Sequence, residues 1–197
     1  MAERRARRHD PQRRDRIVDA CLRVVGEVGV AGASTRRIAA AADVPLGSIT
    51  YHFDDVDALL REAFERFTRR VSDRFERAMA AAPDRAAARD AVIALISVEV
   101  LTDPHELVLT QELYTLAARD PGFRRLTHDW MSRSRRALER HVDPQTARLL
   151  DALIEGMTIH RALDTEPPDP SDVAEAVDRV LAAARPDGPR APGDGRP

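Results

Sequence analysis

The sequence predicts an all-α protein of about nine helices, in which a small N-terminal lobe precedes a larger helical one. Apolar residues recur every three or four positions along most of the chain, which is the period of a helix. Glycine and proline fall between these stripes, where helices begin and end. With 197 residues, 43% of them hydrophobic, the chain is long enough to bury a substantial core.

The first helix has one apolar face, and two glycines end it. Gly29 and Gly32 follow the stripe directly and turn the chain, as glycine commonly does at a helix C-terminus. The stripe has helical spacing and consists of Ile17, Cys21, Val24, Val25 and Val28.

Two short helices follow, at residues 35–42 and 46–53. Ser34 suits the N-cap of the first, because its hydroxyl can accept a hydrogen bond from a backbone N–H group of the first turn. Pro45 separates the two helices, since proline disfavours helical geometry at the residue before it. Asp43 lies in the turn between them and tolerates left-handed backbone angles better than most residues do.

Six longer helices are expected behind this pair. The first covers residues 54–82, carries one apolar stripe and would reach about 40 Å in length. The next, at residues 84–102, is apolar nearly all round, which predicts the buried centre of the second lobe. Prolines mark the boundaries of the others, which are expected at residues 105–119, 121–141, 144–164 and 173–184.

The composition excludes several classes of function. The lone cysteine allows neither an intramolecular disulfide framework nor a cysteine-based zinc site. The histidines form no metal-binding motif, and the chain has neither a phosphate-binding glycine loop nor a serine nucleophile motif. We therefore expect no enzyme, no cofactor and no metal. The most apolar run, residues 91–101, is too short to span a bilayer, which predicts a soluble protein with no membrane partner. The lone cysteine fits a reducing compartment, so we expect a cytoplasmic protein.

The net charge of −2 hides an asymmetry along the chain. Residues 1–53 carry a net charge of +4 and the remaining residues carry −6, and every basic residue is arginine. A basic N-terminal lobe suggests a polyanionic partner for that lobe alone.

The two short helices have the residue pattern of a helix-turn-helix. Ile38 would pack the first helix inward, Ile49 would pin the second, and the small Ala42 would let them cross closely. The same pattern fits an ordinary helical hairpin with polar surface residues. In the DNA-reading alternative, a major groove about 12 Å wide accepts the second helix. The face offered to that groove would consist of Ser48, Thr50, Tyr51 and His52.

Three runs of residues carry a family resemblance. Residues 34–39 (STRRIA), 42–53 (ADVPLGSITYHF) and 59–60 (LL) resemble the N-terminal domain of TetR-type transcriptional regulators. The resemblance covers roughly residues 13–60, and the number of helices behind it also fits. It implies a ligand-responsive, sequence-specific DNA-binding regulator, typically a repressor that a small-molecule effector releases from a palindromic operator.

The resemblance also implies an organisation and a set of DNA contacts. A basic arm at residues 1–10 would precede a helix-turn-helix DNA-binding domain at 11–55. A ligand-binding and dimerisation domain at 56–185 and a disordered tail at 186–197 would follow. Arg36 matches a position that can reach a base. The DNA contacts expected are Thr35, Arg36, Arg37, Leu46, Gly47, Ser48, Thr50, Tyr51 and His52.

Three positions depart from the family's pattern. Asp43 replaces the usual turn glycine, Thr50 replaces a frequent tyrosine, and Val56 replaces a frequent lysine. Losing a lysine that faces phosphate should weaken binding to DNA of any sequence. A ligand-binding or protein-interaction module with a degenerate DNA lobe therefore stays open as an alternative. The arginines between residues 4 and 14 could compensate by reaching phosphates or the minor groove.

The helix at 144–164 has two apolar faces, and a single lobe cannot cover both. One face holds Leu149, Leu153, Gly156, Met157 and His160, and the other holds Leu150, Ile154 and Ile159. We therefore expect a homodimer, with Gly156 allowing close helix approach. A dimer would place two recognition helices about one turn of DNA apart, on a pseudo-palindromic operator.

The resemblance implies a small-molecule effector, of unknown identity, in the second domain. Ligand pockets are mostly apolar with a few placed polar groups, so polar and aromatic residues within apolar stripes are the candidates. Glu99 is the most informative, because a buried carboxylate must be paired or liganded. Facing a cavity, it would favour a cationic or hydrogen-bond-donating ligand; the alternative is an ion pair with an arginine. The candidates are Phe67, Glu99, Gln111, Tyr114, Trp130, Met157 and His160.

Overall fold

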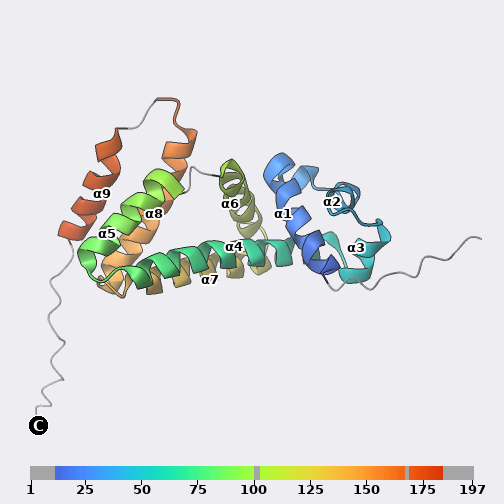
Figure 1. Ribbon diagram of the computed structural model, residues 1–197, viewed down its shortest axis with the longest axis horizontal. Coiled ribbons are helices and arrows are strands. Elements are labelled where there is room, and N and C mark those ends of the chain that lie inside the picture. The colour runs from blue at the N-terminus through green and yellow to red at the C-terminus, as the bar shows by residue number, and fades with distance from the viewer. Residues whose placement is uncertain (1–11, 100–102, 167–168, 184–197) are drawn as a thin grey trace, which may run out of the picture. The chain divides into compact units, whose positions relative to one another are not determined.

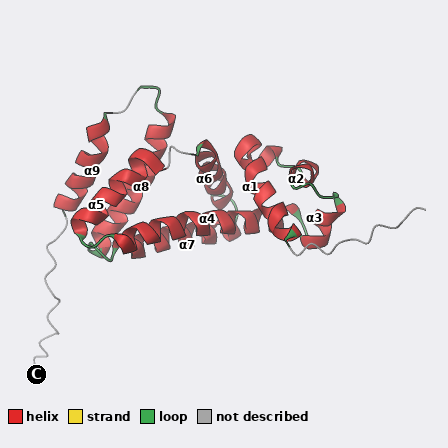
Figure 2. Ribbon diagram, in the orientation of Figure 1, coloured by secondary structure: helices red, strands yellow, loops and turns green. Residues whose placement is uncertain are grey.

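The computed structural model describes residues 12–99, 103–166 and 169–183 (Figure 1). Within these ranges the chain forms nine α-helices and one short π-helix, and no strand occurs there (Figure 2). The all-α prediction is confirmed. The predicted basic arm at 1–10 and the predicted tail at 186–197 lie outside the described residues. The helices are α1 (Arg13–Gly32), α2 (Thr35–Ala41), α3 (Gly47–His52), α4 (Val56–Ala81), α5 (Arg85–Ala94), the π-helix η1 (Leu95–Glu99), α6 (Pro104–Ala117), α7 (Pro121–Leu138), α8 (Pro144–Leu163) and α9 (Pro170–Ala182).

Aspartate and proline together start several of these helices. Asp103, Asp143 and Asp169 each cap a helix whose first residue is proline, and each carboxylate accepts a hydrogen bond from a backbone N–H group of the first turn. Proline suits that first position because its missing N–H group would have no helical partner there. The helix starts are thus encoded locally. The starts predicted at residues 105 and 144 lie within one residue of the starts of α6 and α8, whereas the start predicted at 173 is three residues late, because Pro170 begins α9.

The chain packs as two compact units. The first unit comprises residues 1–73 and 103–130, and the second comprises residues 74–102 and 131–197. Packing therefore groups α6 and the first half of α7 with α1 to α3, although they are distant in sequence. This division follows contacts and not function, so the predicted functional boundary between residues 55 and 56 stays a prediction.

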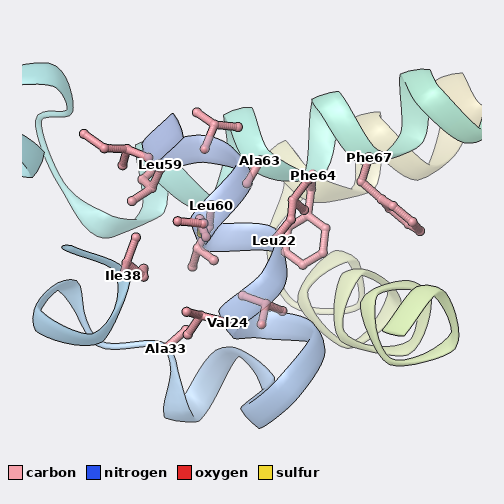
Figure 3. Packing of buried hydrophobic residues seen from close by; sticks show 14 of the residues in the cluster. Leu22, Val24, Ala33, Ile38, Leu59, Leu60, Ala63, Phe64 and Phe67 are labelled. Atoms are coloured by element: carbon pink, nitrogen blue, oxygen red, sulfur yellow. The ribbon is translucent and has the colours of Figure 1, made fainter. Parts of the chain in front are cut away.

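The core of the first unit lies between α1, α2, α4, α6 and α7. Figure 3 shows Leu22 of α1, Ile38 of α2 and Phe64 of α4 among the side chains that fill it. Cys21 is fully buried there, and burial raises the pKa of its thiol to about 12. A thiol that stays protonated is a poor nucleophile, which agrees with a structural role.

The core of the second unit joins α5, η1, α8 and α9 with the adjoining ends of α4 and α7. The prediction that residues 84–102 form a buried centre is wrong. Ala88, Val92 and Ile96 are buried on one face, whereas Val98 is 63% exposed. The segment is also not one continuous α-helix, because it changes to a π-helix at Leu95.

Within the described residues, no helix combines the length and the apolar character needed to cross a bilayer.

Candidate functional site

The turn between α2 and α3 has helix-turn-helix geometry without a glycine. Asp43 adopts a φ of 52°, the left-handed region that an aspartate tolerates. The N–H of Asp43 donates to the carbonyl of Ala40 at 3.2 Å, and that of Val44 donates to the carbonyl of Ala39 at 3.0 Å. The replacement of glycine therefore preserves the turn, as expected.

Two adjacent arginines at the start of α2 have different surroundings. Ser34 caps the helix, as predicted, by accepting a hydrogen bond from the N–H of Arg37 at 3.3 Å. The Arg37 guanidinium donates to the carbonyl of Gly32 at 2.6 Å, so it is engaged in holding the link between α1 and α2. Arg36 is exposed and has no hydrogen bond or ion pair within the described part of the chain. Of the pair, Arg36 is therefore available to an external partner.

The recognition helix α3 exposes most of the predicted contact residues. Tyr51 is 83% exposed and stands edge-on to the His52 ring, with the ring centroids 5.0 Å apart. Leu46, Gly47 and Thr50 are also exposed, and His52 is half-buried. The proposed groove-facing role of the Ser48 side chain is wrong, because Ser48 is only 9% exposed. In so short a helix Ser48 shares the inward face with Ile49, which anchors α3 to the core.

Arg14 holds α3 in place, which differs from its predicted place among the arginines that could reach phosphates or the minor groove. Its guanidinium lies 4.9 Å from the centroid of the Phe53 ring, directly after α3. The same group pairs with the carboxylate of Glu62 in α4 at 2.5 Å. A cation over an aromatic face is attracted to it. Arg14 therefore links the first helix, the end of the recognition helix and α4.

The start of α4 is acidic where the resemblance implies a lysine. Asp55 caps the helix by accepting a hydrogen bond from the N–H of Ala58 at 2.6 Å, and Asp54 and Asp57 are exposed beside it. Val56 is half-buried and packs against the first core. This helix end therefore presents carboxylates, which repel phosphates, in place of a cation.

Four of the predicted ligand residues belong to the first unit, and three of these are in contact. The rings of Phe67 and Trp130 meet edge-on with centroids 5.9 Å apart. Tyr114 and Trp130 stack with centroids 6.1 Å apart and planes inclined by 11°. We call Phe67, Tyr114 and Trp130 the aromatic cluster. Gln111 lies one turn before Tyr114 in α6, and its Nε2 atom is buried with no acceptor among the described residues.

The buried acid of the first unit is Glu106, and sequence reasoning missed it. Glu106 is 8% exposed. Its carboxylate lies 3.5 Å from the Arg70 guanidinium, which lies 5.9 Å from the centroid of the Phe67 ring. Its position three residues before Leu109 places it on the apolar stripe of α6, a signal that was readable in the sequence. The side chain of Glu99, the acid predicted for this role, lies outside the described residues.

Met157 and His160 belong to the second unit, so the predicted ligand set is divided between the two. Met157 and Leu153 pack against the second core with Leu150 and Ile154, which corrects their predicted place on the other face of α8. His160 is exposed.

The outer face of α8 exposes small and apolar residues. Leu149 is 49% exposed and Leu163 is 64% exposed. A Cβ atom added at Gly156, between them, would meet nothing within 4 Å. These residues, together with Ala152 and His160, form a face that the rest of the second unit leaves uncovered, as the two-faced pattern of α8 predicts.

Comparisons with known proteins agree with this architecture. Residues 17–63 match the family model of bacterial regulatory proteins of the tetR family, and residues 83–183 match that of the tetracyclin repressor-like, C-terminal domain. The solved structure of the transcriptional regulator SCO7518 from Streptomyces coelicolor A3(2) has 56% sequence identity and a TM-score of 0.80, covering 86% of this chain and 98% of that chain.

Two further relatives are informative. The multidrug binding protein EbrR, solved in complex with ethidium, is 38% identical with a TM-score of 0.72, covering 87% of this chain and 99% of that chain. The HTH-type transcriptional regulator BetI of Paraburkholderia xenovorans (strain LB400) is 27% identical over 186 residues, which are 87% of this chain and 94% of the relative.

A helix-turn-helix with an available arginine, joined to a second helical region of this type, defines a ligand-responsive DNA-binding transcriptional regulator. The chain belongs to the TetR family. Repressors and dimers are typical of this family.

Proposed function

We propose that this regulator is a repressor that binds a pseudo-palindromic operator as a homodimer and releases it when a planar aromatic cation binds at the aromatic cluster. The observation that carries the proposal is the parallel Tyr114–Trp130 stack. The third ring of the cluster, Phe67, lies 5.9 Å from the Arg70 guanidinium that pairs with the buried carboxylate of Glu106. The relative EbrR, solved with ethidium, supports this class of ligand.

The aromatic cluster suits a flat ligand. Tyr114 and Trp130 are half-buried, so their stack keeps an accessible edge. A third ring placed on this stack would gain the attraction that offset aromatic pairs provide. A positive charge on the ligand would add a cation–π term, which strengthens as water is excluded.

Glu106 and Arg70 supply the charge selectivity in this proposal. The Arg70 side chain is 55% exposed and pairs with Glu106 at 3.5 Å, so the pair is long and Arg70 can turn toward solvent. A ligand cation would then take the place of the guanidinium. An anionic ligand would gain nothing from the exchange, because the buried carboxylate would repel it.

The helix α6 connects the proposed effector site with the DNA-reading helices. Tyr114 of α6 belongs to the aromatic cluster, and His105 at the start of α6 packs against Gly26 of α1. The helix α1 leads directly into α2. In this proposal α6 has two positions, and only one of them lets the helix-turn-helix bind the operator. A ligand that binds the other position more tightly would shift the protein toward it. A coupling free energy of about 1–3 kcal/mol between the two sites changes operator affinity about 5- to 150-fold.

Titration with ethidium tests the proposal. Trp130 is the only tryptophan, so its fluorescence reports on the cluster directly. We expect saturable quenching and loss of operator binding, with the operator obtained by selection from a random duplex library. The chain has two tyrosines, one in each proposed site, which provide matched variants. Tyr114→Leu should abolish the response to ethidium and keep operator affinity, whereas Tyr51→Leu should keep ethidium binding and weaken the operator complex.

The Tyr114→Leu variant also separates the effect of ethidium on the protein from its effect on DNA. Release that persists undiminished in Tyr114→Leu would come from the dye acting on the duplex, and it would overturn the proposed effector site. Unchanged quenching in that variant would do the same.

A ligand-binding module with a degenerate DNA lobe is the second candidate. The acidic start of α4 and the half-buried Val56 favour it. Binding to duplex DNA of random sequence at low salt separates the two, because a working DNA lobe retains this electrostatic affinity. No binding by folded protein at low salt would favour the second candidate.

A further inference from the structure

Arg161 places a permanent positive charge on the core-facing side of α8. The helical period puts it in line with Leu150, Ile154 and Met157, which pack in the second core. Its Nε and Nη1 atoms are buried, and neither has a hydrogen-bond partner among the residues that the structure describes. An arginine so placed is unusual, because guanidinium stays charged at every accessible pH and must find acceptors when it loses water.

Two other arginines of the second unit have guanidinium groups that are hydrogen-bonded to a carboxylate. Arg133 donates from two nitrogens to the carboxylate of Glu76, at 2.7 and 2.8 Å. Arg89 likewise donates from Nε and Nη2 to the two carboxylate oxygens of Asp178, at 2.5 and 2.7 Å. The Nε and Nη1 atoms of Arg161 are buried and, unlike those two guanidinium groups, hold no carboxylate among the described residues.

Thr158 presents a second unmet donor one turn earlier on α8. Its Oγ1 atom is buried and has no partner in the described part of the chain. Threonines within a helix commonly donate to the carbonyl four residues before, as Thr110 and Thr115 do in α6 at 2.8 and 2.9 Å. The Thr158 hydroxyl makes no such bond, so it remains able to donate elsewhere. Two neighbouring side chains thus offer donors and lack an acceptor.

We propose that Thr158 and Arg161 form a binding site for the carboxylate of a small organic acid with an apolar body. The guanidinium fork matches the two oxygens of a carboxylate, and the Thr158 hydroxyl supplies a further donor. Ile154 and Met157, half-buried on the same side of α8, supply an apolar wall for the rest of the ligand. The π-helix η1 packs against α8, and π-helical turns are frequent at functional sites.

This site is separate from the proposed effector site. Thr158 and Arg161 belong to the second unit, whereas the aromatic cluster belongs to the first. The expected ligand also has the opposite charge. The two proposals can therefore fail independently.

Sodium benzoate is a suitable probe, because it joins a carboxylate to a compact apolar ring. The full-length protein would be titrated by calorimetry and by thermal unfolding, with sodium chloride replaced stepwise by benzoate to hold the ionic strength constant. We expect saturable binding and a rising unfolding midpoint, since a ligand that binds only the folded state stabilises it. Sodium phosphate should bind more weakly, and equal affinity for phosphate would overturn the assignment to carboxylates.

Arg161→Met is the decisive variant, and Arg148→Met, which removes an exposed arginine from the same helix, is its control. We expect Arg161→Met to weaken benzoate binding about tenfold or more, because a charge-assisted bidentate pair is lost. It should also raise the unfolding midpoint without benzoate, since it removes an unpaired buried charge. Arg148→Met should change neither quantity. Thr158→Val, which keeps the side-chain shape, should weaken benzoate several-fold.

Two results would overturn the proposal. Benzoate affinity that is the same in wild type and Arg161→Met would show that the guanidinium does not hold the carboxylate. A fall in the unfolding midpoint of unliganded Arg161→Met would show that Arg161 is satisfied within the chain and serves the fold.

Discussion

Gly26 of α1 and His105 of α6 lie in direct contact. A Cβ atom added at Gly26 would stand 2.9 Å from the Cβ atom of His105, closer than real Cβ atoms approach other atoms. Three residues later Gly29 interrupts α1 with a φ of 69°, and a Cβ atom there would collide with the carboxylate of Glu112. Gly26 therefore permits the close packing of α1 against α6, and Gly29 provides the left-handed bend of α1.

Replacing Gly26 by alanine should disturb this packing. The contact is to the Cβ atom of His105, which cannot rotate away, so α1 and α6 must move apart. We expect the free energy of unfolding to fall by about 1–3 kcal/mol, as overpacking usually costs. Denaturation in urea measures it. Stability equal to wild type would show that the interface adjusts without strain, and that it is a poor carrier of an effector signal.

Gly47, at the start of the recognition helix, provides the opposite case. A Cβ atom added there would meet nothing within 4 Å. Gly47→Ala should therefore keep the stability of the fold or raise it by about 0.5–1 kcal/mol, because alanine favours the helix. Operator affinity should nevertheless fall, since the added methyl group would keep the backbone from the DNA. Full operator affinity in Gly47→Ala would remove this residue from the predicted contacts.

Arg36 and Arg37 should separate DNA reading from folding. Arg36→Ala should lower operator affinity by about 1–3 kcal/mol and relax the base preference at one position, if Arg36 reads a guanine. The stability of the Arg36→Ala variant should equal that of wild type, because Arg36 has no hydrogen bond or ion pair within the described residues. Arg37→Ala should lower stability, since the bond to the carbonyl of Gly32 is lost. Operator selection and thermal unfolding on both variants would measure these effects. A stability loss in Arg36→Ala with unchanged operator affinity would contradict the prediction.

Leu163 on α8 should matter for assembly more than for folding. Leu163 is 64% exposed, and Val98 on η1 is 63% exposed. A substitution at Val98 therefore serves as the matched control for one at Leu163. If the outer face of α8 is the dimer interface, Leu163→Gln should shift the protein toward monomer in analytical ultracentrifugation and lower operator affinity. Val98→Gln should change neither. A dimer unaffected by Leu163→Gln would place the interface elsewhere.

The pair between Asp178 and Arg89 should make stability depend on acid. The hydrogen bonds from Arg89 hold the pKa of the Asp178 carboxyl below its ordinary value of 3.8. Its contribution to stability is therefore present above pH 3.8 and is lost as the pH falls through the lower, folded-state pKa. Asp178→Asn should lower the unfolding midpoint near neutral pH, and the difference from wild type should narrow in strong acid. A constant difference across that range would contradict the assignment.

Sequence reasoning located the helices because their signals are local. The stripe through Ile17 and Cys21, the cap at Ser34 and the prolines at the helix boundaries each act within a few residues, so no distant contact is needed to recognise them. The same locality explains why the left-handed turn at Asp43 was anticipated. The family resemblance is equally local, since its motif lies within residues 13–60.

What the sequence by itself determined is therefore the all-α class, the helix-turn-helix and the kind of protein. Only the tertiary structure decided which residues meet: that Ser48 turns inward, that Phe67, Tyr114 and Trp130 form one cluster, and that Glu106 pairs with Arg70. Helical periodicity states which face of a helix is apolar, but not which helix covers that face. That choice is made by contacts between residues far apart in the chain, such as those of α6 with α1.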